Sequence, residues 1–364
     1  MKKKFLSTLL SVAMTAVMLL GCGSSSTTAE PTTSTTTETT TEVAADTATQ
    51  TQDASTDTTT DDAAASDNIV VGFSQVGAES DWRTANTASM KATFTEENGY
   101  TLLFDDAQQK QENQIKAVRN FIQQDVDYIV IAPVTETGWD TVLKEAQDAG
   151  IPVIIVDRMV DVSDDSLYEA WVGSNFLQEG YDAADWLAEY LDKQGRGADA
   201  INIVTLQGTI GASAQIGRTN GIEEKMAEHT NWTMLERQTG EFTQAKGQEV
   251  MESFLKSYDD INVVIAENDN MAFGAIDAIK AAGKTCGPDG DIIIVSFDAV
   301  SAAFDSMIAG DMNVSVECNP LHGPRVAELI QKLEKGEAVD KIAYVDEGVY
   351  PAETAAAKKP TREY

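Results

Sequence analysis

The sequence predicts an α/β protein made of two doubly wound domains, each with a parallel sheet. Three observations favour this class. Short β-branched runs recur between residues 69 and 316, and amphipathic segments of helical period separate them. Residues 68–364, which follow a polar stretch near the N-terminus, are too many for one ordinary core and suit two domains of similar size.

The first domain is predicted from alternating strands and helices. The strand runs are residues 69–73, 101–104, 128–131 and 152–156, all rich in Val, Ile, Leu or Phe. Two helical faces lie among them, and their apolar residues are Ile115, Val118, Phe121 and Ile122 in one and Trp139, Val142, Leu143 and Ala146 in the other. Strand, helix, strand, helix with short connections is typical of a doubly wound sheet.

The second domain repeats this pattern, with strand runs at residues 201–204, 263–266, 292–295 and 313–316. In open parallel sheets, ligands bind beyond the carboxyl ends of the strands. The polar residues that follow each run are therefore the candidates for a site.

The N-terminus has the pattern of an export signal. Lys2, Lys3 and Lys4 precede an apolar run over residues 5–20, which ends before Gly21 and Cys22. This pattern resembles a bacterial lipobox, so we expect a signal peptide at residues 1–21 and a lipid on Cys22. An uncleaved membrane helix is the alternative, but the run is short for a span.

Residues 22–67 are predicted to form a disordered acidic linker. After Cys22 this stretch consists mainly of Thr, Ser, Ala, Asp and Glu, with no Lys, Arg, Trp, Tyr or Phe. It supplies part of the formal net charge of -33. Because phosphate binding needs clustered Lys and Arg, we expect no nucleic-acid partner.

The cysteine count argues against a disulfide framework. There are three cysteines, and the lipid accounts for Cys22. Cys286 and Cys318 could pair, but we expect two buried thiols.

Polar and charged residues follow the predicted strands at most of their carboxyl ends. They are Ser80, Asp81, Trp82 and Arg83 after the first run, Asp157 and Arg158 after the fourth, residues 208–213 and Arg218 after the fifth, residues 267–269, Asp298 and Glu317 after the later runs. Asp, Asn and Ser also cap helices at such turns, and this alternative is open for any single residue. Helix capping is a weaker explanation for one Trp, three Arg and three carboxylates taken together.

The charges of this set indicate an uncharged, hydroxyl-rich ligand. Arg83, Arg158 and Arg218 balance Asp157, Asp298 and Glu317. Each sugar hydroxyl can donate to a carboxylate and accept from a guanidinium, and the face of Trp82 can cover the C–H side of a ring. The sequence therefore predicts a site for a neutral monosaccharide.

Several ordered motifs resemble a known family. They are Val71-Gly72-Phe73-Ser74-Gln75-Val76-Gly77 running into Trp82-Arg83, then residues 108–115, then Ala132-Pro133-Val134 with Thr137-Gly138-Trp139. The chain resembles the type I periplasmic binding proteins of sugar ABC importers, and within them the galactofuranose-binding branch. The similarity runs from Ile69 to the C-terminus.

The resemblance implies ligand contacts at matching positions. These are Ser80, Trp82, Arg83, Asn113, Asp157, Arg158, Arg218, Phe242, Asn268, Asp298 and Glu317. Glu317 departs from the glutamine of some relatives. The resemblance also implies three hinge strands, near residues 172–175, 316–318 and 343–345, with a first lobe of residues 68–173 plus 317–342 and a second of 174–316 plus 343–364.

The implied function is capture of a monosaccharide by lobe closure and delivery to an ABC permease and its ATPase. We expect a monomer held by the lipid on Cys22 at the outer face of the cell membrane, with no cofactor, no metal and no catalytic residue.

A receptor for a chemotaxis or two-component sensor is an alternative. A glycosidase is a weaker one, because nearby arginines hold the acids ionised. The Gly208–Ser213 turn has no phosphate-loop lysine, and a repressor does not fit the signal.

Overall fold

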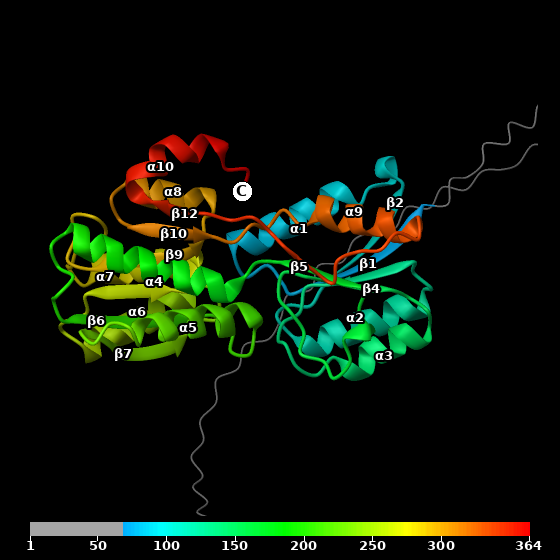
Figure 1. The fold of residues 1–364 in the computed structure, drawn as a ribbon, viewed down its shortest axis with the longest axis horizontal. Helices are drawn as coiled ribbons and strands as arrows, with labels where there is room; N and C mark the ends of the chain where they lie inside the picture. Colours follow the sequence, from blue (N-terminus) through cyan, green and yellow to red (C-terminus); the bar gives the residue numbers. More distant parts are fainter. Residues whose placement is uncertain (1–67) are drawn as a thin grey trace, which may run out of the picture. The chain divides into compact units, whose positions relative to one another are not determined.

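A computed structural model describes residues 68–364. The predicted signal peptide, the lipid on Cys22 and the linker at residues 22–67 lie outside the described residues. Within residues 68–364, none of the helices is both long and apolar enough to span a membrane. The described residues fold into two lobes, each built on a six-stranded sheet (Figure 1). This architecture confirms the predicted fold class.

The first lobe carries the sheet with strand order β11-β5-β4-β3-β1-β2, in which all neighbours are parallel. Its strands are β1 (Ile69–Gln75), β2 (Tyr100–Asp106), β3 (Tyr128–Ile131), β4 (Val153–Val156), β5 (Ala170–Gly173) and β11 (Ile342–Tyr344). Its helices are α1 (Asp81–Thr93), α2 (Gln111–Gln123), α3 (Asp140–Asp148) and α9 (Gly323–Glu334), with short 3-10 turns at Glu96–Asn98 and Asp165–Leu167.

The second lobe carries the sheet with order β12-β10-β9-β8-β6-β7, in which only β12 runs antiparallel to its neighbour. Its strands are β6 (Ile201–Gln207), β7 (Trp232–Thr239), β8 (Val263–Ala266), β9 (Ile293–Asp298), β10 (Val314–Glu317) and β12 (Val349–Pro351). Its helices are α4 (Phe176–Lys193), α5 (Ser213–Met226), α6 (Gln244–Ser257), α7 (Asp269–Ala281), α8 (Ser301–Ile308) and α10 (Ala352–Lys358), with a last 3-10 turn at Lys359–Thr361.

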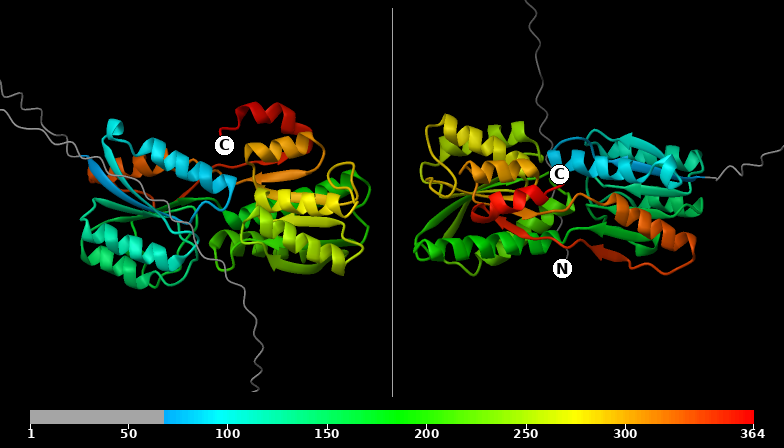
Figure 2. Two further views of the ribbon diagram at one scale, coloured as in Figure 1. Left: turned by 180° about the vertical axis from the view of Figure 1, so that it is seen from behind. Right: turned by 90° about the horizontal axis from the view of Figure 1, so that it is seen from above.

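Helices cover both faces of each sheet (Figure 2). In the first lobe, Met90 of α1 and Ile330 of α9 belong to the core on one face, and Phe121 of α2 and Leu143 of α3 belong to the core on the other. In the second lobe, α4 and α5 pack on one face, and α6, α7 and α8 contribute to the core on the other. Burial of the strands between two helical layers explains why the strand runs are mainly apolar.

The chain crosses between the lobes three times. We call residues 174–175, between β5 and α4, the first crossing, and residues 318–322, between β10 and α9, the second crossing. Residues 345–348, between β11 and β12, form the third crossing. Because β11 pairs with β5 of the first sheet, residues 343–344 belong to the first lobe. The sequence-based boundary at residue 342 was therefore a few residues too early.

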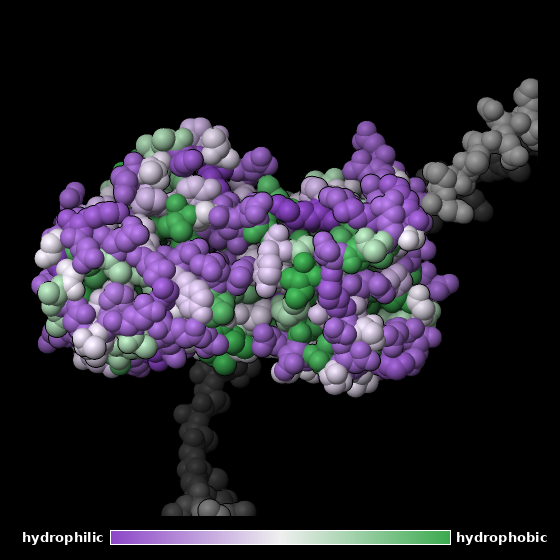
Figure 3. Space-filling view, viewed as in Figure 1, coloured by the Kyte–Doolittle hydropathy of each residue, from purple (hydrophilic) through white to green (hydrophobic). Residues whose placement is uncertain are grey.

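Most of the face seen in Figure 3 is hydrophilic, with a few apolar residues between polar ones. Among the described residues, the large hydrophobic side chains that are exposed are Leu177, Ile210, Ile308, Ile342 and Tyr344. Cys286 and Cys318 are both buried and are free thiols, as expected.

Candidate functional site

A small cavity lies where the carboxyl ends of the two sheets meet. Its cavity volume is about 20 Å³, which is room for about one water molecule, so side chains of the two lobes fill most of the space between them. Its lining comes from both lobes and comprises Glu79, Ser80, Trp82, Arg83, Asp157, Arg158, Phe176, Ala214, Arg218, Phe242, Asn268, Asp298 and Cys318.

The structure brings together nine of the eleven residues predicted to bind the ligand. Asn113 and Glu317 do not line the cavity. Asn113 lies in the first turn of α2, and its side-chain amide donates to the Ala107 carbonyl at 3.0 Å. Glu317 ends β10, and its carboxylate forms an ion pair with Arg362 at 2.8 Å. Because successive strand residues point to opposite sides, the cavity receives Cys318 and the C-terminal segment receives Glu317.

A buried ion-pair network forms the part of the cavity that belongs to the first lobe. Arg83 lies 2.7 Å from Asp157 and 3.0 Å from Glu79. Arg158 lies 3.5 Å from Glu79, and its Nη1 donates to the Val134 carbonyl at 3.0 Å. Each of these side chains is at most 4% exposed.

The pKa values in this network follow burial and pairing. Burial raises the pKa of Asp157, but Arg83 and Arg158 outweigh it and lower that pKa below its usual value. Burial opposes the charge on Arg83, yet Asp157 and Glu79 raise its pKa. Burial and the positive charge of Arg83 lower the pKa of Arg158 to about 10. Both guanidiniums stay charged at neutral pH and can donate to a ligand oxygen.

A second buried network surrounds Arg218 in the other lobe. Its Nε lies 2.6 Å from Glu179, its Nη2 lies 3.3 Å from Asp298, and its Nη1 donates to the Glu267 carbonyl. Burial raises the pKa of Asp298 well above its usual value despite the opposing charge of Arg218. Asp157 and Asp298 therefore each have an arginine partner, as expected, and that arginine lowers the pKa of the acid against the effect of burial.

Direct contacts hold the two lobes together around the cavity. Trp82 Nε1 donates to the Cys318 carbonyl at 2.6 Å, and the Asp81 amide donates to Asn270 Oδ1 at 3.0 Å. The guanidinium of Arg158 lies 5.0 Å from the centre of the Phe242 ring, which belongs to the second lobe. The described arrangement is therefore a closed one, with Arg158 of one lobe facing an aromatic ring of the other.

Helix capping and the cavity use some of the same side chains. Ser80 Oγ accepts from the Arg83 amide at the start of α1, and Asn268 Oδ1 accepts from the Met271 amide at the start of α7. Asn268 Nδ2 also donates to the Phe242 carbonyl at 3.0 Å. Capping and cavity lining are thus compatible for these residues, and Asn268 helps to fix the position of Phe242.

Three cavity residues hold a left-handed backbone that side chains disfavour. Asp157 and Phe242 both have φ 61°, and Asp298 has φ 102°. Each such residue costs roughly 1–3 kcal/mol, and this kind of strain gathers at binding sites. The Phe242 ring also packs against Gly208, where an added Cβ would lie 1.9 Å from ring atom Cζ. Gly208 therefore leaves the space that this ring occupies.

Sequence reasoning missed four residues that line the cavity: Glu79, Phe176, Ala214 and Cys318. Glu79 stands directly before the predicted Ser80 and four residues before Arg83, and this spacing on a helix start could have indicated an ion pair. With Glu79 in place of Glu317, three arginines still meet three carboxylates in the lining. The cavity thus has strong donors and acceptors but no excess of charged side chains of either sign.

The chain is similar to known proteins over almost the whole described region. The periplasmic binding protein domain model matches residues 71–338. The chain belongs to the periplasmic binding protein family. The galactofuranose-binding protein YtfQ of Escherichia coli K12 is 44% identical over 291 residues, which cover 79% of this chain and 89% of that protein.

Solved structures show the same similarity. A Mycobacterium smegmatis protein in complex with β-D-fucofuranose is 45% identical, with a TM-score of 0.77 over 81% of this chain and 95% of that one. The periplasmic component of the arabinose ABC transporter from Shewanella sp. ANA-3, bound to α- and β-L-arabinofuranose, is 47% identical, with a TM-score of 0.76 over 81% and 95%. Each of these relatives is named for a furanose sugar or was solved with one bound.

Proposed function

We propose that this chain is an extracytoplasmic solute-binding protein that captures one neutral monosaccharide, galactofuranose or a related furanose, for an ABC importer. The observation that carries the proposal is the small cavity in which three arginines and three carboxylates from two lobes surround aromatic rings. The relatives support it, because their names and bound sugars are galactofuranose, fucofuranose and arabinofuranose.

The proposed mechanism is closure of the lobes on the sugar. Asp157 and Arg158 bind the hydroxyls from the first lobe, and Arg218 binds them from the second, with Phe242 covering the ring. A ligand favours the closed form only through contacts that it makes better there than in an open form. A sugar that bridges Arg158 and Arg218 meets this condition, and the permease would then bind the closed monomer.

The other proposed ligand residues act alongside these. Ser80, Trp82, Arg83, Asn268 and Asp298 complete the set in the cavity, with Glu79 as an added acceptor. One oxygen of Glu79, Oε2, is buried without a hydrogen-bond partner among the described residues. A sugar hydroxyl can donate to it, which removes the cost of a buried acceptor that has no donor.

Anchoring by a lipid on Cys22 belongs to the same proposal. It rests on Lys2–Lys4, the apolar run and the Gly21-Cys22 pair. Labelling of cells with a radioactive fatty acid should mark the parent chain and not Cys22→Ser. Equal labelling of both would contradict the anchor.

Titration calorimetry with L-arabinose, D-galactose, D-ribose and D-fructose tests which neutral sugar the chain binds. We expect one sugar per chain and the tightest binding for sugars that populate a furanose form. No heat from any of them, together with release of nitrophenol from a nitrophenyl galactofuranoside, would replace this proposal with a glycosidase.

A further inference from the structure

The three crossings between the lobes meet at a buried cluster of polar side chains. Glu347 Oε1, on the third crossing, accepts a hydrogen bond from Ser174 Oγ of the first crossing at 2.6 Å. The same oxygen accepts from the Asn319 amide of the second crossing at 2.6 Å. Ser174 Oγ also lies 3.2 Å from Cys318 Sγ. One carboxylate thus connects all three crossings.

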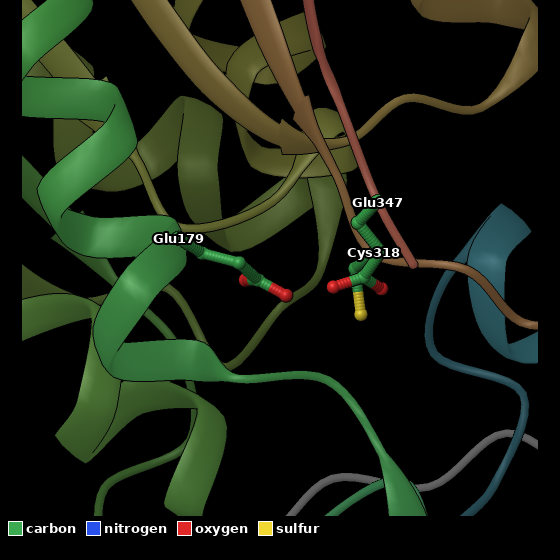
Figure 4. Close-up of side chains that lie close together, drawn as sticks. All are labelled: Glu179, Cys318 and Glu347. Atoms are coloured by element: carbon green, nitrogen blue, oxygen red, sulfur yellow. The ribbon is translucent and has the colours of Figure 1, made fainter. Parts of the chain in front are cut away.

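Three potential metal ligands face one another in this cluster. A carboxylate oxygen of Glu179, a carboxylate oxygen of Glu347 and Cys318 Sγ all lie within 4.8 Å of one another. Figure 4 shows the Glu179 carboxylate and the side chains of Cys318 and Glu347 pointing into the same space. We call these three residues the hinge cluster.

One oxygen of the hinge cluster lacks a partner. Glu179 Oε2 pairs with Arg218 Nε at 2.6 Å, whereas Glu179 Oε1 is buried without a hydrogen-bond partner among residues 68–364. The Glu179 side chain is 3% exposed. A buried carboxylate oxygen is costly unless a donor or a cation faces it. A cation or a proton donor at this point would remove that cost.

We propose that Glu179, Cys318 and Glu347 hold a divalent cation of the zinc class at the hinge. Zinc accepts mixed thiolate and carboxylate ligands in tetrahedral sites, whereas calcium and magnesium prefer six or more oxygens. Tetrahedral zinc with bonds of about 2.0–2.3 Å keeps its ligand atoms roughly 3.3–3.7 Å apart. The hinge cluster, with ligand atoms within 4.8 Å, needs only small side-chain rotations to reach that spacing. The Ser174 hydroxyl is the nearest candidate for the fourth position.

The charges of the surroundings fit a dication. Two carboxylates and a thiolate give three negative charges, and Arg218 supplies one positive charge beside them. A dication brings this sum to zero. Arg218 also pairs with Asp298 at 3.3 Å, which adds a further negative charge beside the cluster.

The experiment uses cadmium as the probe, because its bond to a thiolate produces a charge-transfer band in the ultraviolet. The full chain is titrated with CdCl₂, alongside Cys318→Ser and two matched controls, Cys286→Ser and Cys22→Ser. We expect one band per chain that is lost only in Cys318→Ser. A parent chain without the band, or a Cys318→Ser variant that keeps it, would overturn the proposal.

A second variant separates metal binding from misfolding. Glu347→Gln retains an oxygen that can accept from Ser174 and Asn319, so the hinge should fold as in the parent. Zinc titration followed by competition with a chelator should show at least a tenfold weaker affinity for this variant. Equal affinity in parent and Glu347→Gln would remove Glu347 from the site and contradict the proposal.

Discussion

Replacing Arg158 by alanine should weaken sugar binding far more than folding. Its guanidinium lines the cavity and is 3% exposed, and it lies 5.0 Å from the Phe242 ring across the cleft. A hydrogen bond to a charged group contributes about 1.5–3 kcal/mol, and a partly buried cation–π contact about 1 kcal/mol. Together these predict a loss of about 2.5–4 kcal/mol, which is roughly a 60- to 700-fold increase in Kd.

Folding should be affected less, because Arg83 still forms an ion pair with each of the two acids after the change. It lies 2.7 Å from Asp157 and 3.0 Å from Glu79. Arg158 Nε lies 3.9 Å from Asp157, so Arg83 is the closer partner of this acid. The main cost of Arg158→Ala is therefore the lost contact to the ligand.

The assay is calorimetry with the tightest-binding neutral sugar, with urea unfolding in parallel. Arg119→Ala is the matched control, because Arg119 forms an exposed pair with Glu145 at 2.7 Å. We expect that control to bind within twofold of the parent. An Arg158→Ala protein that binds within threefold of the parent would refute the reasoning.

Three further changes test other parts of the structure. Asn270→Ala removes two hydrogen bonds to Asp81 across the cleft, at 3.0 and 3.4 Å, so Kd should rise about 5- to 30-fold by calorimetry; unchanged affinity would show that this contact does not favour closure. Glu317→Gln weakens the ion pair with buried Arg362, so the free energy of unfolding in urea should fall by about 1–3 kcal/mol, while the Kd for the sugar should stay within twofold of the parent. A large loss of affinity would show that Glu317 does contact the ligand. Burial raises the pKa of Glu267 from 4.5 to about 7. Between these pH values the folded state keeps the carboxyl proton and the unfolded state releases it, so the free energy of unfolding falls by roughly 3 kcal/mol as the pH rises from about 4.5 to 7. Glu267→Gln should lack that slope in urea melts at several pH values, and parallel pH curves for the two proteins would contradict it.

Strands with an apolar run could be predicted, and short or polar strands could not. The eight runs found from the sequence are mainly apolar, and they include β2 at the edge of the first sheet. β7 was missed because it lies at a sheet edge, where most of its residues are polar and partly or fully exposed. β5 was missed because Ala170–Gly173 is short and contains Trp and Gly among its four residues.

The sequence predicted the site residues that directly follow strands, but it did not predict which neighbouring residue of a strand faces the cavity. Nine residues that follow strands or resemble family positions line the cavity. Glu317 and Cys318 are neighbours, and which of the two faces the cavity depends on the pleat of β10, which a residue type does not reveal. The pairing of Arg83 with Asp157 depends on side-chain placement across separate elements, which one sequence cannot supply.

The hinge cluster shows a further limit of sequence reasoning. Its members Glu179, Cys318 and Glu347 lie far apart in the chain and match no metal-binding spacing, so no metal was expected. They meet because three separate crossings converge. Such a site becomes visible only once the topology is known.

The central claim is that a charge-balanced cavity between two lobes binds an uncharged sugar. The direct measurement compares Kd for galactose, galacturonate and galactosamine by calorimetry with the same protein. Neutral galactose should bind, and both charged analogues should bind at least 100-fold more weakly, because each adds a charge that the balanced lining leaves unpaired. Tighter binding of the acid or of the amine than of galactose would contradict the account.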